Sequence, residues 1–220
     1  MAIVCPTVTA QSEAQYKNQL DRVVPLARRL HLDFMDGEFA PVTSLPLDKA
    51  WWPTGMQIDL HVMFQRPAQH IAQFIRLRPR LVIVHAEADG DFYELSQKLQ
   101  AAGIKIGLAL LQQTSVDKIA SVLPTLDHVL IFSGDLGHFG GTAEMSLLNK
   151  VRQIKSAHPA LEVGWDGGIN ERNIESLVAG GVDVLNVGGF IQKADNPVHA
   201  YATLKEAITK KANRYEKADR

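Results

Sequence analysis

The stretch His31-Leu32-Asp33-Phe34-Met35-Asp36-Gly37 alternates polar and apolar side chains and then ends at a glycine. In a β-strand, side chains two residues apart share one face, so His31 and Asp33 lie together while the residues between and after them face the other way. A second stretch, Asp59-Leu60-His61-Val62-Met63, repeats this alternation. The two stretches predict two strands, each carrying a histidine and an aspartate on one face.

Short apolar runs of the same kind recur along the whole chain. We expect strands at residues 2–8, 31–35, 57–63, 81–85, 104–111, 128–132, 161–165 and 182–187. The segments between them carry apolar residues at helical spacing, as in residues 91–102 and 143–157. Strands that alternate with helices predict parallel strands joined by right-handed crossovers.

This alternation either closes into an eight-stranded barrel or stays open as a doubly wound sheet. The number of runs and their near-even spacing favour closure. An open dinucleotide-binding sheet places a glycine fingerprint after its first strand, whereas the turn here is Thr7-Val8-Thr9-Ala10. We therefore predict an α/β protein with a single (β/α)8 TIM-barrel domain over residues 1–220. In such barrels the functional groups gather at the C-terminal ends of the strands.

The composition is that of an ordinary globular protein. The 220 residues are 46% hydrophobic and carry a net charge of −1, which argues against a nucleic-acid-binding surface. Cys5 is the single cysteine, so the chain has no intrachain disulfide and fits a reducing compartment. The N-terminus lacks the pattern of a signal peptide, and no apolar run approaches the roughly 20 residues that span a bilayer. We expect a soluble cytoplasmic protein without a nucleic-acid or membrane partner.

Polar residues at the predicted strand ends indicate a metal site. His31 and Asp33 lie on the second strand, His61 lies on the third, and Asp166 ends the seventh. One histidine on a strand is usually structural, but two imidazoles and two carboxylates at one barrel mouth are typical of a functional cluster. This donor set suits Zn²⁺, Fe²⁺, Mn²⁺ or Co²⁺.

Two further polar residues allow more than one interpretation. Asp59 either forms hydrogen bonds that orient the metal ligands or accepts hydrogen bonds inside its strand. His85 ends the fourth strand, where it is a further ligand, a substrate contact or a structural residue. We assign no chemistry to His128.

Glycine pairs follow three successive strands. They are Gly140-Gly141 after the sixth strand, Gly167-Gly168 after the seventh and Gly188-Gly189 after the eighth. Glycines let backbone N–H groups approach an anion closely, and a short helix after the eighth strand adds its positive end. One pair alone is a weak signal, since turns and helix ends also use glycine. Together they predict a phosphorylated substrate held by backbone amides, without a dedicated arginine or lysine.

These residues resemble the ribulose-phosphate 3-epimerase family over nearly the whole chain. The stretch from His31 to Gly37 is similar to the family signature His-x-Asp-x-Met-Asp-Gly, and Asp59 to Met63 is similar to its second metal-binding strand. Ile106-Gly107-Leu108-Ala109 is similar to the fifth strand of the family. Phe139-Gly140-Gly141, Gly167-Gly168 and Gly188-Gly189 are similar to its phosphate loops. The resemblance implies a TIM barrel of the ribulose-phosphate-binding type.

The resemblance also implies a reaction. One divalent metal per subunit would be held by His31, Asp33, His61 and Asp166. The two aspartates would act as acid and base on opposite faces of C3, converting D-ribulose 5-phosphate to D-xylulose 5-phosphate through a 2,3-enediolate. A cation beside the carbonyl acidifies the neighbouring C–H and stabilises the enediolate charge. The implied enzyme is a cytoplasmic homo-oligomer, a dimer or larger, of the pentose phosphate pathway.

The surroundings of the reacting carbon follow from the same resemblance. We expect substrate and phosphate contacts from Thr7, His61, Gly140, Gly141, Gly167, Gly168, Gly188 and Gly189. We expect Met35, Met63 and Phe132 to form an apolar wall that keeps water from the enediolate.

The chain also departs from the family pattern around its predicted ligands. Thr7 stands where the family has serine, and Gly189 stands where a serine often binds phosphate. The loops at residues 39–46, 112–113 and 134–139 differ as well. Two alternatives therefore stay open: a 3-epimerase of a ketohexose 6-phosphate such as allulose 6-phosphate, and a non-catalytic barrel that binds a sugar phosphate. The paired aspartates count against the second, since a pure binder needs no two opposed bases.

Overall fold

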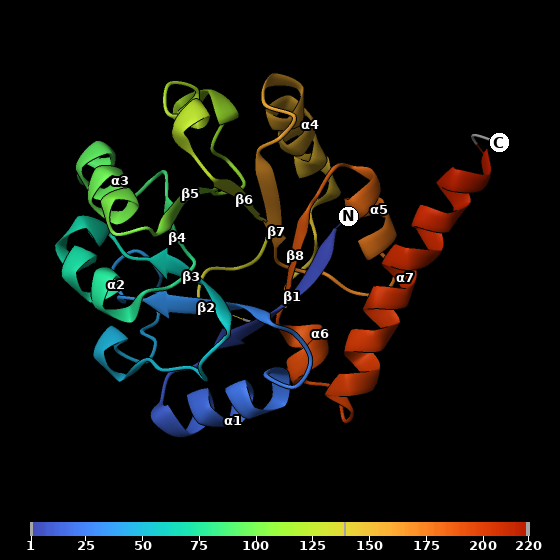
Figure 1. Cartoon of the computed structure of the whole chain (residues 1–220), viewed down its shortest axis with the longest axis horizontal. Helices are drawn as coiled ribbons and strands as arrows, with labels where there is room; N and C mark the ends of the chain where they lie inside the picture. The colour runs from blue at the N-terminus through green and yellow to red at the C-terminus, as the bar shows by residue number, and fades with distance from the viewer. Residues whose placement is uncertain (1, 139, 219–220) are drawn as a thin grey trace.

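The strands form a closed parallel barrel in which each strand pairs with the next and β8 pairs with β1 (Figure 1). The computed structural model describes residues 2–138 and 140–218, with side chains up to residue 209. The strands are β1 (Ile3–Thr9), β2 (Arg29–Met35), β3 (Gln57–Met63), β4 (Leu81–His85), β5 (Lys105–Leu110), β6 (His128–Phe132), β7 (Glu162–Asp166) and β8 (Val184–Val187). The predicted barrel is confirmed, and the predicted strand ends lie within two residues of those observed.

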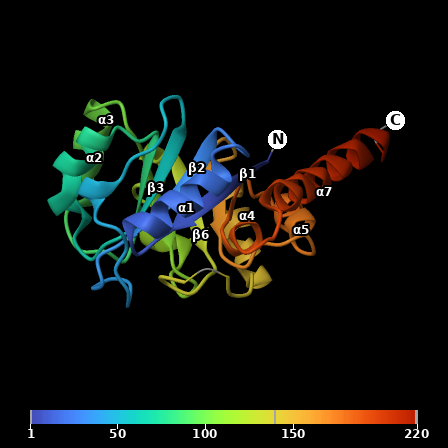
Figure 2. The same ribbon diagram turned by 90° about the horizontal axis from the view of Figure 1, so that it is seen from below.

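Helices surround the barrel (Figure 1). They are α1 (Glu13–Val23), α2 (Ile71–Leu77), α3 (Phe92–Ala101), α4 (Leu148–Ala157), α5 (Ile174–Ala179), α6 (Gly189–Gln192) and α7 (Pro197–Ala218). The end of α7 projects beyond the barrel (Figure 2). None of the helices within the described part of the chain combines the length and the apolarity needed to cross a membrane.

Local chemistry explains where these elements begin and end. Asp91 precedes α3, and its side-chain oxygen accepts hydrogen bonds from the backbone N–H groups of Tyr93 and Glu94. The crossover between β5 and β6 differs from the expected helix, because it consists of two short 3₁₀ turns, Val116–Ile119 and Leu123–Thr125. Pro124 lies in the second turn and has no backbone N–H with which to continue a helix.

The apolar core lies mainly between the strands and the surrounding helices. Leu32, Phe34 and Trp165 are outward-facing strand residues that are essentially fully buried there. Inside the barrel, a second apolar cluster comes from β4, β5 and β6 and consists of Leu81, Ile83, Ala109 and Leu130. Polar residues occupy much of the remaining interior.

An ion-pair network fills the N-terminal end of the barrel. Arg29 Nη2 lies 2.6 Å from Asp59 Oδ2, and Arg29 Nη1 donates to Glu162 Oε2 at 2.8 Å. Arg80 Nη1 lies 3.0 Å from Asp59 Oδ1, and His128 Nδ1 lies 2.9 Å from Glu162 Oε1. Of the two roles predicted for Asp59, the structure shows the acceptor inside the strand. Removing one partner of a buried pair like Arg29 and Asp59 lowers the free energy of unfolding by about 3–5 kcal/mol.

Two glycines make room for His128. A Cβ atom at Gly164 would lie 2.5 Å from His128 Nε2, and one at Gly107 would lie 2.9 Å from the His128 carbonyl oxygen. Both distances are too short for non-bonded atoms. These two positions, one on β5 and one on β7, therefore lack side chains because His128 on the strand between them fills the space.

Candidate active site

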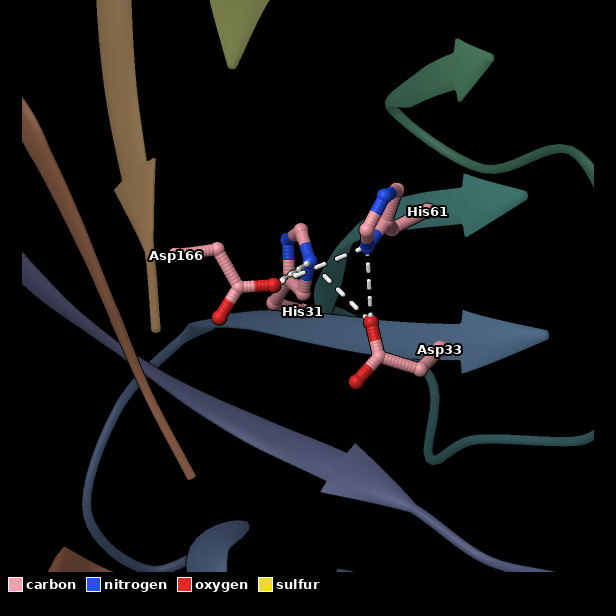
Figure 3. Close-up of side chains that lie close together, drawn as sticks. All are labelled: His31, Asp33, His61 and Asp166. Atoms are coloured by element: carbon pink, nitrogen blue, oxygen red, sulfur yellow. Dashed lines mark hydrogen bonds and ion pairs between the residues drawn. The ribbon is translucent and has the colours of Figure 1, made fainter. Parts of the chain in front are cut away.

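Four polar side chains converge at the C-terminal mouth of the barrel (Figure 3). His61 Nδ1 lies 2.9 Å from Asp33 Oδ1, and His31 Nε2 lies 3.3 Å from the same oxygen. Asp166 Oδ2 lies 3.6 Å from each of these two nitrogens. All four ligand atoms lie within 4.8 Å of one another. That spacing fits one ion with ligands at about 2 Å.

The surroundings of His31 support this fit to a metal. His31 is fully buried, and neither of its ring nitrogens has a hydrogen-bond partner within the described residues. A buried nitrogen without a partner costs about 1–3 kcal/mol. A cation among the four side chains would give His31 Nε2 the partner that it lacks.

The charges of the site favour a positive group at its centre. Burial lowers the pKa of His31, but the neighbouring carboxylates of Asp166 and Asp33 outweigh it and raise that pKa to about 10. Burial raises the pKa of Asp33, yet its contacts with His31 and His61 hold it well below the usual range. A metal ion would therefore displace a proton from His31 on binding.

Strand register places a hydroxyl behind one ligand. In the parallel pair of β1 and β2, Thr7 lies opposite His31 and Thr9 lies opposite Asp33. The Thr9 hydroxyl donates a hydrogen bond to Asp33 Oδ2, which orients Oδ1 toward the two histidines. The sequence reasoning missed Thr9, although its position two residues after Thr7 places it on the same strand face.

A cavity of about 270 Å³ opens above the ligands. The residues predicted to contact substrate that line it are Thr7, Gly140, Gly141, Gly167, Gly168, Gly188 and Gly189, together with Met63 and Phe132. Asp33 and Asp166 also line it, whereas His31, His61 and Met35 are not among the described residues that do. Met35 instead packs in a small buried cluster with Ala40 and Met63.

The glycine loops pack backbone against backbone. A Cβ atom at Gly167 would lie 2.1 Å from the Gly134 nitrogen, and one at Gly168 would lie 2.1 Å from the Ala143 nitrogen. The Gly168 N–H donates to the Gly140 carbonyl oxygen at 3.1 Å. No side chain fits at these two positions, and both glycines line the cavity. Phe139, predicted to belong to the same loop, lies outside the described residues.

Asn186 and Lys193 are among the cavity residues that were absent from the sequence-based prediction. Asn186 on β8 lies opposite Asp166, is 2% exposed, and has no hydrogen-bond partner for either atom of its amide. Its signal was a single polar residue between the apolar residues of its strand. Lys193 also lines the cavity, although the sequence predicted no dedicated lysine.

The structure narrows the alternatives for His85. Its Nε2 lies 2.9 Å from His61 Nε2, on the side of His61 away from Asp33. Burial lowers the pKa of His85 to about 4, so the ring is neutral near neutral pH. His85 is therefore a contact of a ligand residue and stands outside the group of four ligand atoms.

Comparison with known proteins places the chain in a family. A model of the ribulose-phosphate 3 epimerase family matches residues 3–192. The chain belongs to this family. A ribulose-phosphate 3-epimerase of Mycobacterium tuberculosis is 29% identical over 210 residues, which cover 92% of this chain and 91% of that protein. One of Helicobacter pylori is 31% identical over 170 residues, which cover 74% of this chain and 78% of that protein.

Solved structures share the fold of this epimerase-family chain. The 3-hexulose-6-phosphate synthase of Salmonella typhimurium superposes with a TM-score of 0.70 at 11% identity and covers 94% of this chain and 99% of that one. The orotidine 5'-monophosphate decarboxylase of Sulfolobus solfataricus gives a TM-score of 0.67 at 15% identity, covering 96% and 100%. At such low identity the likeness concerns the barrel alone.

Proposed function

We propose that this protein is a metal-dependent epimerase that inverts C3 of a ketose phosphate, with D-ribulose 5-phosphate and D-xylulose 5-phosphate as its substrate pair. The observation that carries the proposal is the placement of Asp33 and Asp166. Both carboxylates lie at the edge of a centre that fits a metal, and both line the cavity that the glycine loops enclose. Membership of the epimerase family supports the same reaction.

In this mechanism the two aspartates move the proton at C3. When bound, the metal polarises the substrate carbonyl and stabilises negative charge on the neighbouring oxygens. One carboxylate takes the C3 proton, which leaves a 2,3-enediolate, and the other returns a proton to the opposite face. The hydrogen bond from Thr9 holds Asp33 in a single orientation during this exchange. The direction of the reaction decides which aspartate acts as the base.

Other cavity residues bind the substrate. The glycine loops offer backbone N–H groups to the phosphate, apart from that of Gly168, which is donated to Gly140. Lys193 adds a positive charge nearby. Thr7 and Asn186 are buried and lack partners for their side-chain polar atoms, so we assign them to substrate hydroxyl groups. Phe132 and Met63 line the cavity and keep water from the enediolate.

The proposal extends to the cofactor and the setting of the reaction. The metal is one of Zn²⁺, Fe²⁺, Mn²⁺ and Co²⁺, because mixed imidazole and carboxylate ligands suit each of them. We place the enzyme in the cytoplasmic pentose phosphate pathway; a relative from rice is named as a cytoplasmic isoform. Trp51, which is 46% exposed, supports a homo-oligomer.

Exchange of the C3 proton with solvent tests the proposal. Metal-loaded protein in D₂O should incorporate deuterium at C3 of D-ribulose 5-phosphate and should lose this activity with a chelator. Faster exchange into allulose 6-phosphate would identify the ketohexose 3-epimerase instead. Tight binding of a ketose phosphate without exchange into any of them would identify a non-catalytic binder. Metal-loaded Asp166→Asn protein is the control, because it keeps the cavity but loses one proton-transfer group.

A further inference from the structure

Ser133, directly after β6, joins the two ends of the loop that carries Gly140-Gly141. Its N–H donates to the Asp166 carbonyl oxygen at 2.7 Å. Its Oγ accepts the Glu144 N–H at 2.7 Å and donates to the Thr142 carbonyl oxygen at 3.4 Å. Ser133 is buried, so water does not replace these partners. The start of the loop is therefore bound both to the end of β7 and to the segment that leads into α4.

Gln112 binds the same residue from the neighbouring strand. It follows β5, in the stretch where the chain departs from the family pattern. Its side-chain Nε2 donates to the Ser133 carbonyl oxygen at 3.1 Å. A carbonyl oxygen only accepts, so the nitrogen of the Gln112 amide faces Ser133. The departure from the family pattern thus supplies a further hydrogen bond at the base of the loop.

Lys150 on α4 fixes the turn from which Gln112 reaches the loop. Its Nζ donates to the carbonyl oxygens of Leu111 and Gln112, each at 2.8 Å. An ammonium group has three hydrogens, so it makes both bonds at once. The Leu111 N–H donates to Glu87 Oε1 at 3.1 Å, which binds the turn to the segment after β4 as well. Because α4 follows the loop in the chain, both sides of the loop are bound to one turn.

These contacts reach the cavity through the glycines. Gly140 and Gly141 line the cavity together with Gly168, and the Gly168 N–H donates to the Gly140 carbonyl oxygen at 3.1 Å. Gln112 and Lys150 are not among the described residues that line it. Their influence on a bound phosphate would therefore come from the position of the loop and not from direct contact.

We propose that Gln112 and Lys150 are positioning residues that hold the glycine loop ready for the substrate phosphate. A loop that is ordered before binding loses less conformational entropy when it takes up the anion, so the restraint strengthens binding. Neither residue hydrogen-bonds to a metal-ligand side chain within the described structure. Loss of the restraint should therefore raise KM and leave kcat nearly unchanged. The inference rests on the phosphate site of the proposed function and not on its chemistry at C3.

Calorimetric binding of D-ribulose 5-phosphate to the metal-loaded, full-length protein tests the inference, with KM and kcat measured beside it. Gln112→Met keeps the length of the side chain but removes the donor, and should weaken binding about 3–10-fold. Lys150→Met should weaken it as well, and Lys150→Arg should restore most of the affinity because it keeps the donors. Lys155→Met is the matched control. Lys155 also lies on α4 and donates to a carbonyl oxygen, that of Leu161, but at the other end of the barrel. This control should keep its affinity and its KM.

NMR measurement of amide hydrogen exchange reports the state of the loop without any ligand. The Glu144 and Gly168 amides close the loop and should exchange faster in Gln112→Met, whereas the Val163 amide should not change. Unchanged affinity or unchanged exchange in a folded Gln112→Met protein would overturn the inference, and so would a lower kcat at unchanged affinity. If Lys150→Met does not fold, Gln112→Met decides. A wild-type protein that binds D-ribulose 5-phosphate but exchanges no C3 proton would contradict the proposed function alone. One that binds no ketose phosphate would contradict both.

Discussion

Replacing Asn186 by valine is expected to stabilise the free protein while impairing its activity. Asn186 is 2% exposed, and neither atom of its amide has a hydrogen-bond partner within the described structure. A buried polar group without a partner costs about 1–3 kcal/mol, and an apolar replacement of similar shape removes that cost. Valine also suits a strand. We expect the free energy of unfolding to rise by about 1–2 kcal/mol.

The same substitution removes a group assigned to a substrate hydroxyl. That hydroxyl would then be buried in the complex without its partner, which again costs about 1–3 kcal/mol. Because about 1.4 kcal/mol corresponds to a factor of ten, kcat/KM for the ketose phosphate should fall roughly 10–100-fold. Stability and activity should therefore change in opposite directions at this position.

Urea unfolding of the metal-loaded protein and steady-state kinetics measure the two effects. Asn170→Val is the matched control, because Asn170 also lines the cavity but its amide is paired with the Gly168 carbonyl and the Arg172 N–H. The control should lose stability, whereas Asn186→Val should gain it. An Asn186→Val protein that is less stable than the wild type and keeps its kcat/KM would refute the reasoning, since its amide would then be satisfied without substrate.

Three other expectations follow from the site and the barrel interior. Metal-loaded Asp33→Asn and Asp166→Asn should each lower the rate of C3 epimerisation about 10²–10⁴-fold, and survival of most activity in either would contradict the two-base assignment. Gly167→Ala should raise KM and lower the urea midpoint, because its Cβ would lie 2.1 Å from the Gly134 nitrogen and the residue has a φ of +111°. A fully stable variant with a normal KM would contradict this, since it would show that the loop can move to make room for the methyl group. Burial lowers the pKa of His128, so the unfolded chain takes up a proton below about pH 6.5 that the folded protein does not. Stability should therefore fall as the pH drops below that value, and His128→Asn should flatten this part of the urea-midpoint profile; an equally steep profile in the variant would exclude His128 as its cause.

The alternation of residues identified the inward strand faces but not the depth of each residue in the barrel. His31 and Arg29 are two residues apart and share one face, yet one lies at the mouth and the other in the ion-pair network at the opposite end. Asp59 stands in the same relation to His61. Period-two spacing fixes the face, whereas depth depends on register between strands, which only the closed barrel supplies.

The contacts missed from the sequence join residues of different strands that pair side by side in the barrel. Thr9 meets Asp33 because β1 pairs with β2, and Asn186 lies opposite Asp166 because β8 pairs with β7. The link between His61 and His85 likewise depends on the side-by-side placement of β3 and β4. The four metal ligands were predictable because each lies in a strand with a characteristic local pattern. Their supporting contacts have no such local pattern.

The pairing of β8 with β1 joins the two ends of the barrel sequence into a ring. His31, Asp33 and His61 come from the N-terminal part of the chain, and Asp166 arrives more than a hundred residues later. Asp166 comes close to the other three ligands only when β8 pairs with β1. Metal affinity therefore also reports whether the barrel is closed. Two half-barrels divided between β4 and β5 would each hold an incomplete set of metal ligands. The complete set would form only when the two halves associate.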